Sequence, residues 1–148
     1  MIMKKVRDYI HKDITSVNEN SNLRRVIKTM KLHRMSAVPV VNKLGEYVGC
    51  ISEQDILNVA VPTYMKSMYD TSFMAGLDQI TTHLKEKLDE KAIRFVDEKY
   101  PSVSPDESMS YAADLLYRQK GTILPVVDGK TLIGLLTRIE ILSVSLDE

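Results

Sequence analysis

The sequence has one cysteine and no tryptophan, and aromatic residues make up only 6% of its 148 positions. A single cysteine excludes an intramolecular disulfide, so the fold must be stabilised by packing and hydrogen bonding alone. Cys50 lies inside an apolar run, which is typical of a small core residue rather than a reactive thiol. These features fit a reducing compartment, and we expect a cytoplasmic location.

The chain also lacks an excess of charge and any long hydrophobic run. Twenty basic residues balance twenty acidic ones, so there is no overall field to attract nucleic acid or an anionic membrane. The longest apolar runs, such as residues 37–41 and 132–136, are strand-sized, and no signal-peptide segment follows the start. We expect a folded, soluble chain with no nucleic-acid or membrane partner, because 44% hydrophobic content suffices for a core.

Sequence patterns for catalysis and metal binding are missing as well. The three histidines, His11, His33 and His83, do not have the spacing of metal ligands. The sequence has no glycine-rich phosphate loop and no nucleophile elbow. We therefore predict no catalytic residue, no metal site and no required cofactor, and we expect the protein not to be an enzyme.

What the chain does contain is an internal duplication. Pro39 and Pro125 are 86 positions apart, and at this offset "SAVPVV" matches "TILPVV" and "KVRDYI" matches "KAIRFV". Beyond the next turn the second copy is one residue shorter, so that "S-E-Q-D" at 52–55 matches "T-R-I-E" at 137–140. The sequence predicts two copies of one structural unit.

Each copy predicts the same order of elements. A short extended piece is followed by a helix over about 19–34 or 105–120, two strands rich in β-branched residues, and a second helix. In the second copy, Ser104 is the expected N-cap, Pro105 the first helical residue and Gly121 the end of the helix. A small sheet covered by helices on one face cannot enclose a core alone, so the two units must pack together.

We divide the chain into a first unit, residues 1–57, a helical connecting insert, residues 58–91, and a second unit, residues 92–148. The insert contains an apolar stripe at helical spacing, formed by Leu77, Ile80, Leu84 and Leu88. Methionines and aromatic residues precede it at positions 64, 65, 68, 69, 73 and 74. They favour either core filling or an adaptable partner-binding surface. An exposed stripe of this kind predicts a homodimer.

The duplicated pattern resembles the tandem cystathionine-β-synthase (CBS) domain pair, also called a Bateman module. The resemblance depends on the "x-P-V-V" run, the following glycine, and the "(S/T)-x-x-(D/E)-I-L" segment, which occur in the same order in both copies. It implies an α+β fold of two β-α-β-β-α units with pseudo-twofold symmetry and two clefts between them. It also implies an adenosine-containing ligand, AMP, ADP, ATP or S-adenosylmethionine, and pairing through the helices into a homodimer.

The resemblance also implies which residues bind that ligand. The motif hydroxyls of Ser52 and Thr137 would face phosphate and Asp55 would hold the ribose, whereas Glu140 stands where aspartate is usual. The residues that would line the base pockets are Thr15, Ser36, Ala37, Val38, Pro39, Ser102, Thr122, Ile123, Leu124 and Pro125. From its own chemistry, Arg138 would contact phosphate in a bidentate manner, while Glu53 would repel it.

The two motifs have a purely structural interpretation too. A hydroxyl residue followed three places later by a carboxylate caps a helix and stabilises it by about 1 kcal/mol without any ligand. Glutamate suits the reciprocal capping box better than aspartate, so we predict Asp55 as the ligand carboxylate and Glu140 as the cap. Two functions remain open: a nucleotide-sensing regulatory module acting in trans on an unidentified protein, or a ligand-free scaffold that uses the insert.

Overall fold

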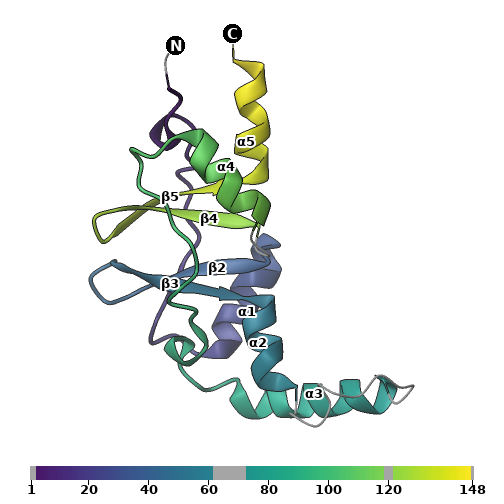
Figure 1. Ribbon diagram of the computed structural model, residues 1–148. Helices are drawn as coiled ribbons and strands as arrows, with labels where there is room; N and C mark the ends of the chain where they lie inside the picture. Colours follow the sequence, from purple (N-terminus) through teal and green to yellow (C-terminus); the bar gives the residue numbers. More distant parts are fainter. Residues whose placement is uncertain (1–2, 62–72, 119–121, 148) are drawn as a thin grey trace.

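The computed structural model describes residues 3–61, 73–118 and 122–147 (Figure 1). The first unit contains the elements η1 (Val6–Asp8), β1 (Val17–Asn18), α1 (Leu23–His33), β2 (Ala37–Val41), β3 (Tyr47–Ser52) and α2 (Glu53–Ala60). Helix α3 (Phe73–Lys87) follows. The second unit contains η3 (Ala92–Phe95), α4 (Met109–Arg118), β4 (Ile123–Asp128), β5 (Thr131–Thr137), α5 (Arg138–Ser143) and η4 (Val144–Leu146).

The two small sheets are built in the same way. Strand β1 pairs in parallel with β2, which pairs antiparallel with β3; β4 pairs antiparallel with β5. In the first unit Val17 lies opposite Val40, and 86 positions later Val103 forms the equivalent parallel bridge to Val126. Helices α1, α2, α4 and α5 lie together on one side of the sheets (Figure 1). The predicted α+β fold of two repeated units is confirmed.

Both helices that follow the first strand begin later than the sequence predicts. Helix α1 is capped by Asn22, whose Oδ1 accepts a hydrogen bond from Arg25 N at 2.9 Å. Helix α4 begins at Met109, and Ser108 Oγ accepts from Tyr111 N at 3.1 Å. Asn22 and Ser108 are 86 positions apart, so the two helices share one capping position.

The predicted helix start at Ser104 and Pro105 is therefore wrong. The Ser104 hydroxyl accepts a hydrogen bond from Asp106 N, 3.2 Å away, within a turn. Residues of this turn instead accept hydrogen bonds from the first 3₁₀-helix: Arg7 N donates to Pro105 O and Val6 N donates to Glu107 O. Because these carbonyls bind the amino-terminal segment, the chain cannot become helical there. The predicted helix end at Gly121 lies outside the described residues.

The segment that leads into each unit crosses to the other unit. His11 exchanges two backbone hydrogen bonds with Leu135, of 2.9 and 3.0 Å. Asp97 exchanges two with Cys50, of 2.8 and 3.3 Å, and this pair is the duplicate of the first. Val6 is accordingly buried in the core of the second unit, whereas Ala92 and Phe95 are buried in the core of the first. Each core is thus completed by residues of the segment that leads into the other unit.

Gly49 in β3 and Gly134 in β5 leave room for the crossing segments. A Cβ atom on Gly49, whose φ is +155°, would lie 2.6 Å from Asp97 O and 2.7 Å from Val96 Cγ1. A Cβ atom on Gly134 would lie 3.1 Å from His11 O. The glycine of the repeated motif therefore serves packing between the units, because only a residue without Cβ allows such a close backbone approach.

A third cluster of buried residues joins the two units. It consists of Ala37, Cys50, Tyr100, Ile123 and Leu135. Ala37 and Ile123 occupy duplicate positions, as do Cys50 and Leu135. The same strand positions therefore meet across the pseudo-twofold axis, and burial of each large apolar side chain contributes about 1.5–3 kcal/mol.

The insert contributes to the first unit. Leu84 of α3 packs against its core, and Ile80 and Leu88 are half-buried. The Leu77 side chain, the methionines and aromatic residues at 64–69, and the side chains of residues 73 and 74 lie outside the described residues. Across residues 3–61, 73–118 and 122–147, no helix has the length and hydrophobicity needed to cross a bilayer.

Candidate functional site

A cavity of about 610 Å³ lies where the amino-terminal segment meets the start of α5, and we call it the Thr137 cleft. Its volume is within the range of roughly 300–1,000 Å³ that small-molecule sites occupy. It is lined by His11, Asp13, Thr15, His33, Arg34, Met35, Thr122, Ile123, Leu135, Thr137, Arg138 and Ile139. Both copies of the repeat contribute walls, so the cavity exists only because the units pack against each other.

The structure brings together five of the predicted site residues: Thr15, Thr122, Ile123, Thr137 and Arg138. The next two residues of the same strand, Leu124 and Pro125, have fully buried side chains and do not line the cleft. In a strand, successive side chains point to opposite faces, and Leu124 belongs to the core of the second unit.

Glu140 does not line the cleft; it forms the capping box of helix α5 with Thr137, which does. Thr137 N donates to Glu140 Oε2 at 3.2 Å, and the Thr137 hydroxyl donates to the same oxygen. A hydroxyl has a single proton to donate, so Thr137 cannot at once donate to Glu140 and to a phosphate oxygen. Among the residues that line the cleft, Arg34 and Arg138 are the permanently cationic donors.

The first motif forms the same box with a shorter side chain. Ser52 N and Ser52 Oγ both donate to Asp55 Oδ2 at 2.9 Å, and Asp55 N donates to Ser52 Oγ at 3.1 Å. The expectation that aspartate would fit the box less well than glutamate is wrong, because Oδ2 alone accepts both bonds. Asp55 Oδ1 accepts no hydrogen bond from the described residues.

The remaining predicted residues line neither cavity, apart from Ser36. Ala37, Val38 and Pro39 are buried, and Val38 belongs to the core of the first unit. Ser102 is exposed and lines neither described cavity. Residues 119–121, the duplicates of His33, Arg34 and Met35, lie outside the described residues.

Positive charge dominates the Thr137 cleft. Arg34 and Arg138 both line it, and neither forms an ion pair with any described residue. Asp13 is the acidic residue that lines it. Arg34 adopts the left-handed conformation (φ 53°, ψ 46°) as the C-cap of α1, and its N–H donates to Lys31 O. The left-handed turn places this arginine between α1 and the start of β2.

Sequence reasoning missed Arg34, His33, His11 and Asp13. Arg34 precedes the predicted site residue Ser36 by two positions, and this short distance in the sequence could have indicated that Arg34 lies near the site. His11 and Asp13 reach the cleft only because the leading segment crosses to the second unit, which no local pattern reveals.

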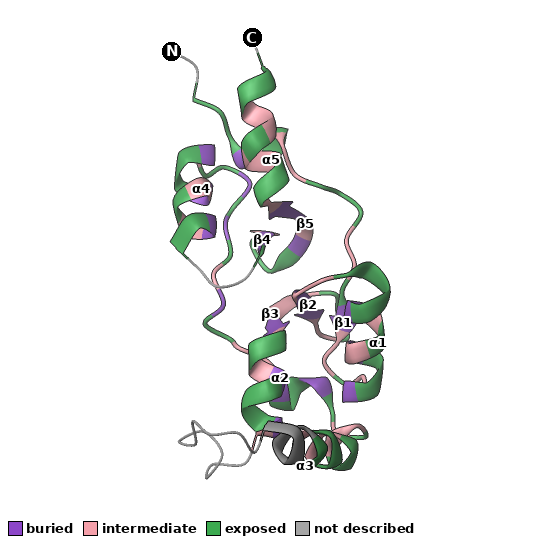
Figure 2. Cartoon of the chain, turned by 90° about the vertical axis from the view of Figure 1, so that its right-hand side faces the viewer, coloured by how far each residue is buried: buried purple, intermediate pink, exposed green. Residues whose placement is uncertain are grey.

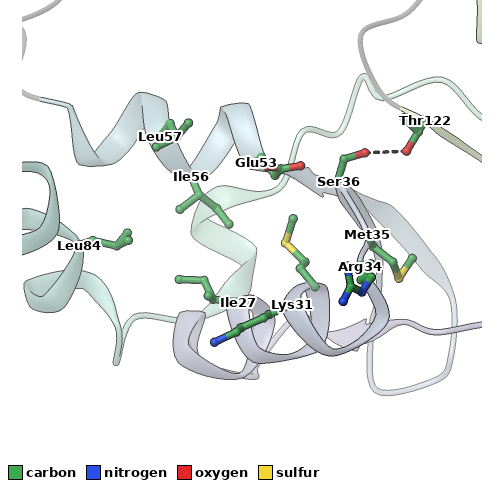
Figure 3. A pocket seen from close by; sticks show the side chains of 11 residues that line it. Ile27, Lys31, Arg34, Met35, Ser36, Glu53, Ile56, Leu57, Leu84 and Thr122 are labelled. Carbon is green, nitrogen blue, oxygen red and sulfur yellow. Dashed lines mark hydrogen bonds between the residues drawn. The ribbon is translucent and has the colours of Figure 1, made fainter. Parts of the chain in front are cut away.

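A second cavity, also of about 610 Å³, lies between α1 and α2, and we call it the helix groove (Figure 3). It is lined by Ile27, Met30, Lys31, Arg34, Met35, Ser36, Glu53, Ile56, Leu57, Leu84 and Thr122. Three of these residues, Arg34, Met35 and Thr122, also line the Thr137 cleft. The Ser36 hydroxyl, which lines the groove, is hydrogen-bonded at 2.6 Å to the hydroxyl of Thr122, which lines both cavities (Figure 3).

The sequence profile of the CBS domain matches residues 6–61 and 92–147. This chain belongs to the CBS-domain family. An uncharacterized protein of Methanocaldococcus jannaschii is 31% identical over 146 residues, which cover 90% of this chain and 86% of that protein.

Solved structures of CBS pairs have the same fold. The CBS-pair protein CBSX2 from Arabidopsis thaliana superposes with a TM-score of 0.78 at 20% identity, over 98% of this chain and 96% of that one. A structure of CBSX2 in complex with AMP superposes with a TM-score of 0.71 at 19% identity, over 97% of this chain and 96% of that one. At these identities the likeness concerns the fold.

The buried titratable groups of this CBS pair are structural. Burial raises the pKa of the Cys50 thiol to about 12, and the Tyr47 hydroxyl lies 3.5 Å from its Sγ. The Tyr100 hydroxyl donates to Ile123 O at 2.8 Å, and burial raises the pKa of Tyr100. The thiol therefore stays protonated at neutral pH. Over the described residues, no group of three or more histidine, cysteine and acidic side chains is arranged to hold a metal ion.

Proposed function

We propose that this CBS pair is a regulatory module that binds an adenosine-containing nucleotide in the Thr137 cleft and acts in trans. The observation that carries the proposal is a cavity of nucleotide size that contains two arginines without ion-pair partners among the described residues, Arg34 and Arg138. A planar guanidinium binds phosphate through two parallel hydrogen bonds. One arginine comes from each repeat, so the phosphates would bridge the units.

The other walls of the cleft suit the rest of a nucleotide. Ile123, Leu135 and Ile139 offer apolar surface to an adenine ring. Glu140 does not line the cleft, but it caps α5 through Oε2 beside Thr137, which leaves Oε1 to accept from a ribose hydroxyl that reaches it. Asp55 does not line this cleft, but a second nucleotide beside the first motif would meet its Oδ1 in the same way, because Oδ2 carries the cap. A capping carboxylate and a ribose-binding carboxylate are thus compatible roles for one side chain.

The regulatory part of the proposal depends on the wall shared with the helix groove. A phosphate that binds Arg34 would change the position of this side chain, which also lines the groove. We propose that the surface around this groove binds a protein partner and that the chain forms a homodimer in the cytoplasm. Leu57, Val59, Tyr117 and Leu142 are exposed large hydrophobic residues on the helices, and an unpaired apolar face of this kind favours association.

The decisive experiment is calorimetric titration of adenosine, AMP, ADP, ATP and S-adenosylmethionine, with thermal unfolding at matched concentrations. At a ligand concentration of 100 times the dissociation constant, the folded state gains about 2.7 kcal/mol. We expect at least one of the five compounds to bind and to raise the melting temperature. No heat and no stabilisation with all five would contradict the proposal.

One observation favours a second candidate function, a ligand-free scaffold. Both motif carboxylates already serve as helix caps, so neither motif requires a ligand to be satisfied. In that case Arg34→Ala and Arg138→Ala would leave partner binding unchanged, and no nucleotide would alter it. The titration therefore separates the two candidates.

A further inference from the structure

One wall of the Thr137 cleft belongs to the leading segment, residues 3–16, which packs on the second unit. His11, Asp13 and Thr15 of this segment line the cleft. Between His11 and β1 the segment forms no helix or strand. The two backbone hydrogen bonds between His11 and Leu135 therefore anchor this wall on the second unit.

The other backbone anchors of the leading segment have counterparts in the other repeat. Val6 N donates to Glu107 O at 2.9 Å, and Ala92 N, 86 positions later, donates to Ser21 O at 2.7 Å. Ser21 is in turn the duplicate of Glu107. These backbone bonds are thus part of the repeated fold and do not distinguish one unit from the other.

The side-chain contacts of the leading segment have no such counterpart among the described residues. The Tyr9 hydroxyl donates to Asp147 Oδ2, and Lys4 Nζ lies 3.3 Å from the same oxygen. The duplicates of Lys4 and Tyr9 are Glu90 and Phe95, which offer neither a cation nor a hydroxyl. Because the first unit folds without this contact, the fold itself does not require it.

A second contact of the leading segment shows the same asymmetry. Arg7 forms an ion pair with Asp106. The duplicate positions hold Ile93 and Asn20, which carry no charge. Both contacts therefore add to the shared backbone anchors where the leading segment borders the Thr137 cleft.

Asp147 lies beyond the far end of the helix that begins at the cleft. Helix α5 starts at Arg138, which lines the cleft, and η4 and Asp147 follow it directly. In Figure 2, α5 runs from β5 to the end of the molecule at which both chain ends lie. The contact of Tyr9 with Asp147 thus ties the leading segment to this helix, two residues before His11.

We propose that Tyr9 and Asp147 are positioning residues whose contact holds the leading-segment wall of the Thr137 cleft in place relative to Arg138. This role rests on the proposed function, since the wall affects a ligand only where the cleft binds one. Neither residue lines the cleft, so both act through His11 and Arg138. The Tyr9 hydroxyl, and next the Lys4 ammonium, hold the pKa of Asp147 below its usual value. The carboxylate therefore stays ionised at neutral pH and accepts both bonds.

Hydrogen exchange measures the position of this wall without any ligand. We expect Tyr9→Phe and Asp147→Asn each to speed exchange of the His11 and Leu135 amides about two- to fivefold, the effect of losing one exposed contact. The Tyr9 ring is only partly buried against the core, and phenylalanine keeps it. The internal control is the duplicate pair of amides, those of Asp97 and Cys50, which should exchange as before. Unchanged exchange at His11 and Leu135, or equal acceleration of both pairs, would overturn the positioning role.

Calorimetric titration with ATP measures the effect on the ligand. We expect Tyr9→Phe and Asp147→Asn each to raise the dissociation constant about two- to fivefold. The double variant should match Asp147→Asn, since the contact is lost only once, and Asp147→Glu, which keeps the carboxylate, should bind more tightly than Asp147→Asn. Asp114→Asn breaks the exposed ion pair with Arg118 on α4 and is the matched control, with unchanged affinity.

The two measurements separate this role from the proposed function. An unchanged dissociation constant in both Tyr9→Phe and Asp147→Asn would overturn the positioning role and leave nucleotide binding in place. If none of the five compounds named above binds the unsubstituted chain, the proposed function is contradicted. The exchange rates of the His11 and Leu135 amides then decide by themselves whether Tyr9 and Asp147 position this wall.

Discussion

The hydroxyls of Ser36 and Thr122 lie 2.6 Å apart, and these residues are 86 positions apart in the sequence. They occupy the same place in the two repeats, so their hydrogen bond lies on the pseudo-twofold axis. Thr122 also lines both cavities, and Ser36 lines the groove. The contact between the duplicated hydroxyls thus joins a residue of the helix groove to a residue that lines both cavities.

Removal of this contact should weaken the packing of one unit on the other. We expect Ser36→Ala or Thr122→Ala to lower the free energy of unfolding by about 1 kcal/mol, the net value of one hydrogen bond. The double variant should cost little more than either single one, since the bond is lost only once. Urea unfolding of the three variants measures this coupling, and strictly additive losses would contradict it.

Arg138 should recognise phosphate. We expect Arg138→Ala to weaken binding of ATP and ADP more than binding of adenosine, by about 1.5–3 kcal/mol if the contact is a charged hydrogen bond. Glu53→Ala is the matched control in the first motif, and its affinity should be unchanged or higher. Calorimetry at fixed salt with adenosine, AMP, ADP and ATP measures both. Equal losses for all four ligands would show that Arg138 does not contact phosphate.

Arg34 should affect stability and affinity in opposite directions. Its left-handed backbone costs a non-glycine residue roughly 1 kcal/mol, so Arg34→Gly should raise the free energy of unfolding. The same substitution removes a guanidinium from the cleft and should lower ATP affinity. Arg34→Lys keeps the charge without the bidentate geometry and is the control for affinity. Unchanged ATP binding in Arg34→Gly would exclude this arginine from the site.

Asp55 should have two effects, because its two oxygens have different environments. Asp55→Ala removes the capping box of α2 and should lower stability by about 1 kcal/mol. It should also abolish binding of a second nucleotide beside the first motif, where Oδ1 would accept from ribose, and leave the Thr137 cleft unaffected because Asp55 does not line it. Thermal unfolding and calorimetry measure the two effects independently. A lower melting temperature with unchanged affinity would leave Asp55 with a structural role alone.

The two motif glycines should differ in their tolerance of a side chain. Gly49→Ala places Cβ 2.6 Å from Asp97 O at a positive φ, and we expect a loss of roughly 2–4 kcal/mol. Gly134→Ala meets His11 O at 3.1 Å and has no positive φ, so its loss should be smaller. Gly129→Ala is the control for strain without crowding, because nothing lies within 4 Å of its Cβ. Equal losses at Gly49 and Gly129 would mean that backbone strain, and not crowding against Asp97, accounts for the lower free energy of unfolding.

The sequence by itself determined the duplication, the order of elements and the α+β fold. These features follow from local patterns: alternating and helical apolar periodicity, turn residues, and the repeat of Pro39 and Gly49 as Pro125 and Gly134. The same patterns located Thr137 and Arg138, because the motif lies at a strand-to-helix junction in both copies.

The tertiary structure alone decided where the helices begin and what completes the cleft. The carbonyls of Pro105 and Glu107 bind the amino-terminal segment, so α4 begins at Met109 rather than at the best local cap. His11 reaches Leu135 by crossing between units, and Arg34 enters the cleft through a left-handed turn. Local sequence patterns cannot predict the contacts of the amino-terminal segment or the packing of Arg34 against the second unit. These contacts join residues far apart in the sequence, and they are stable only once both units are folded and packed.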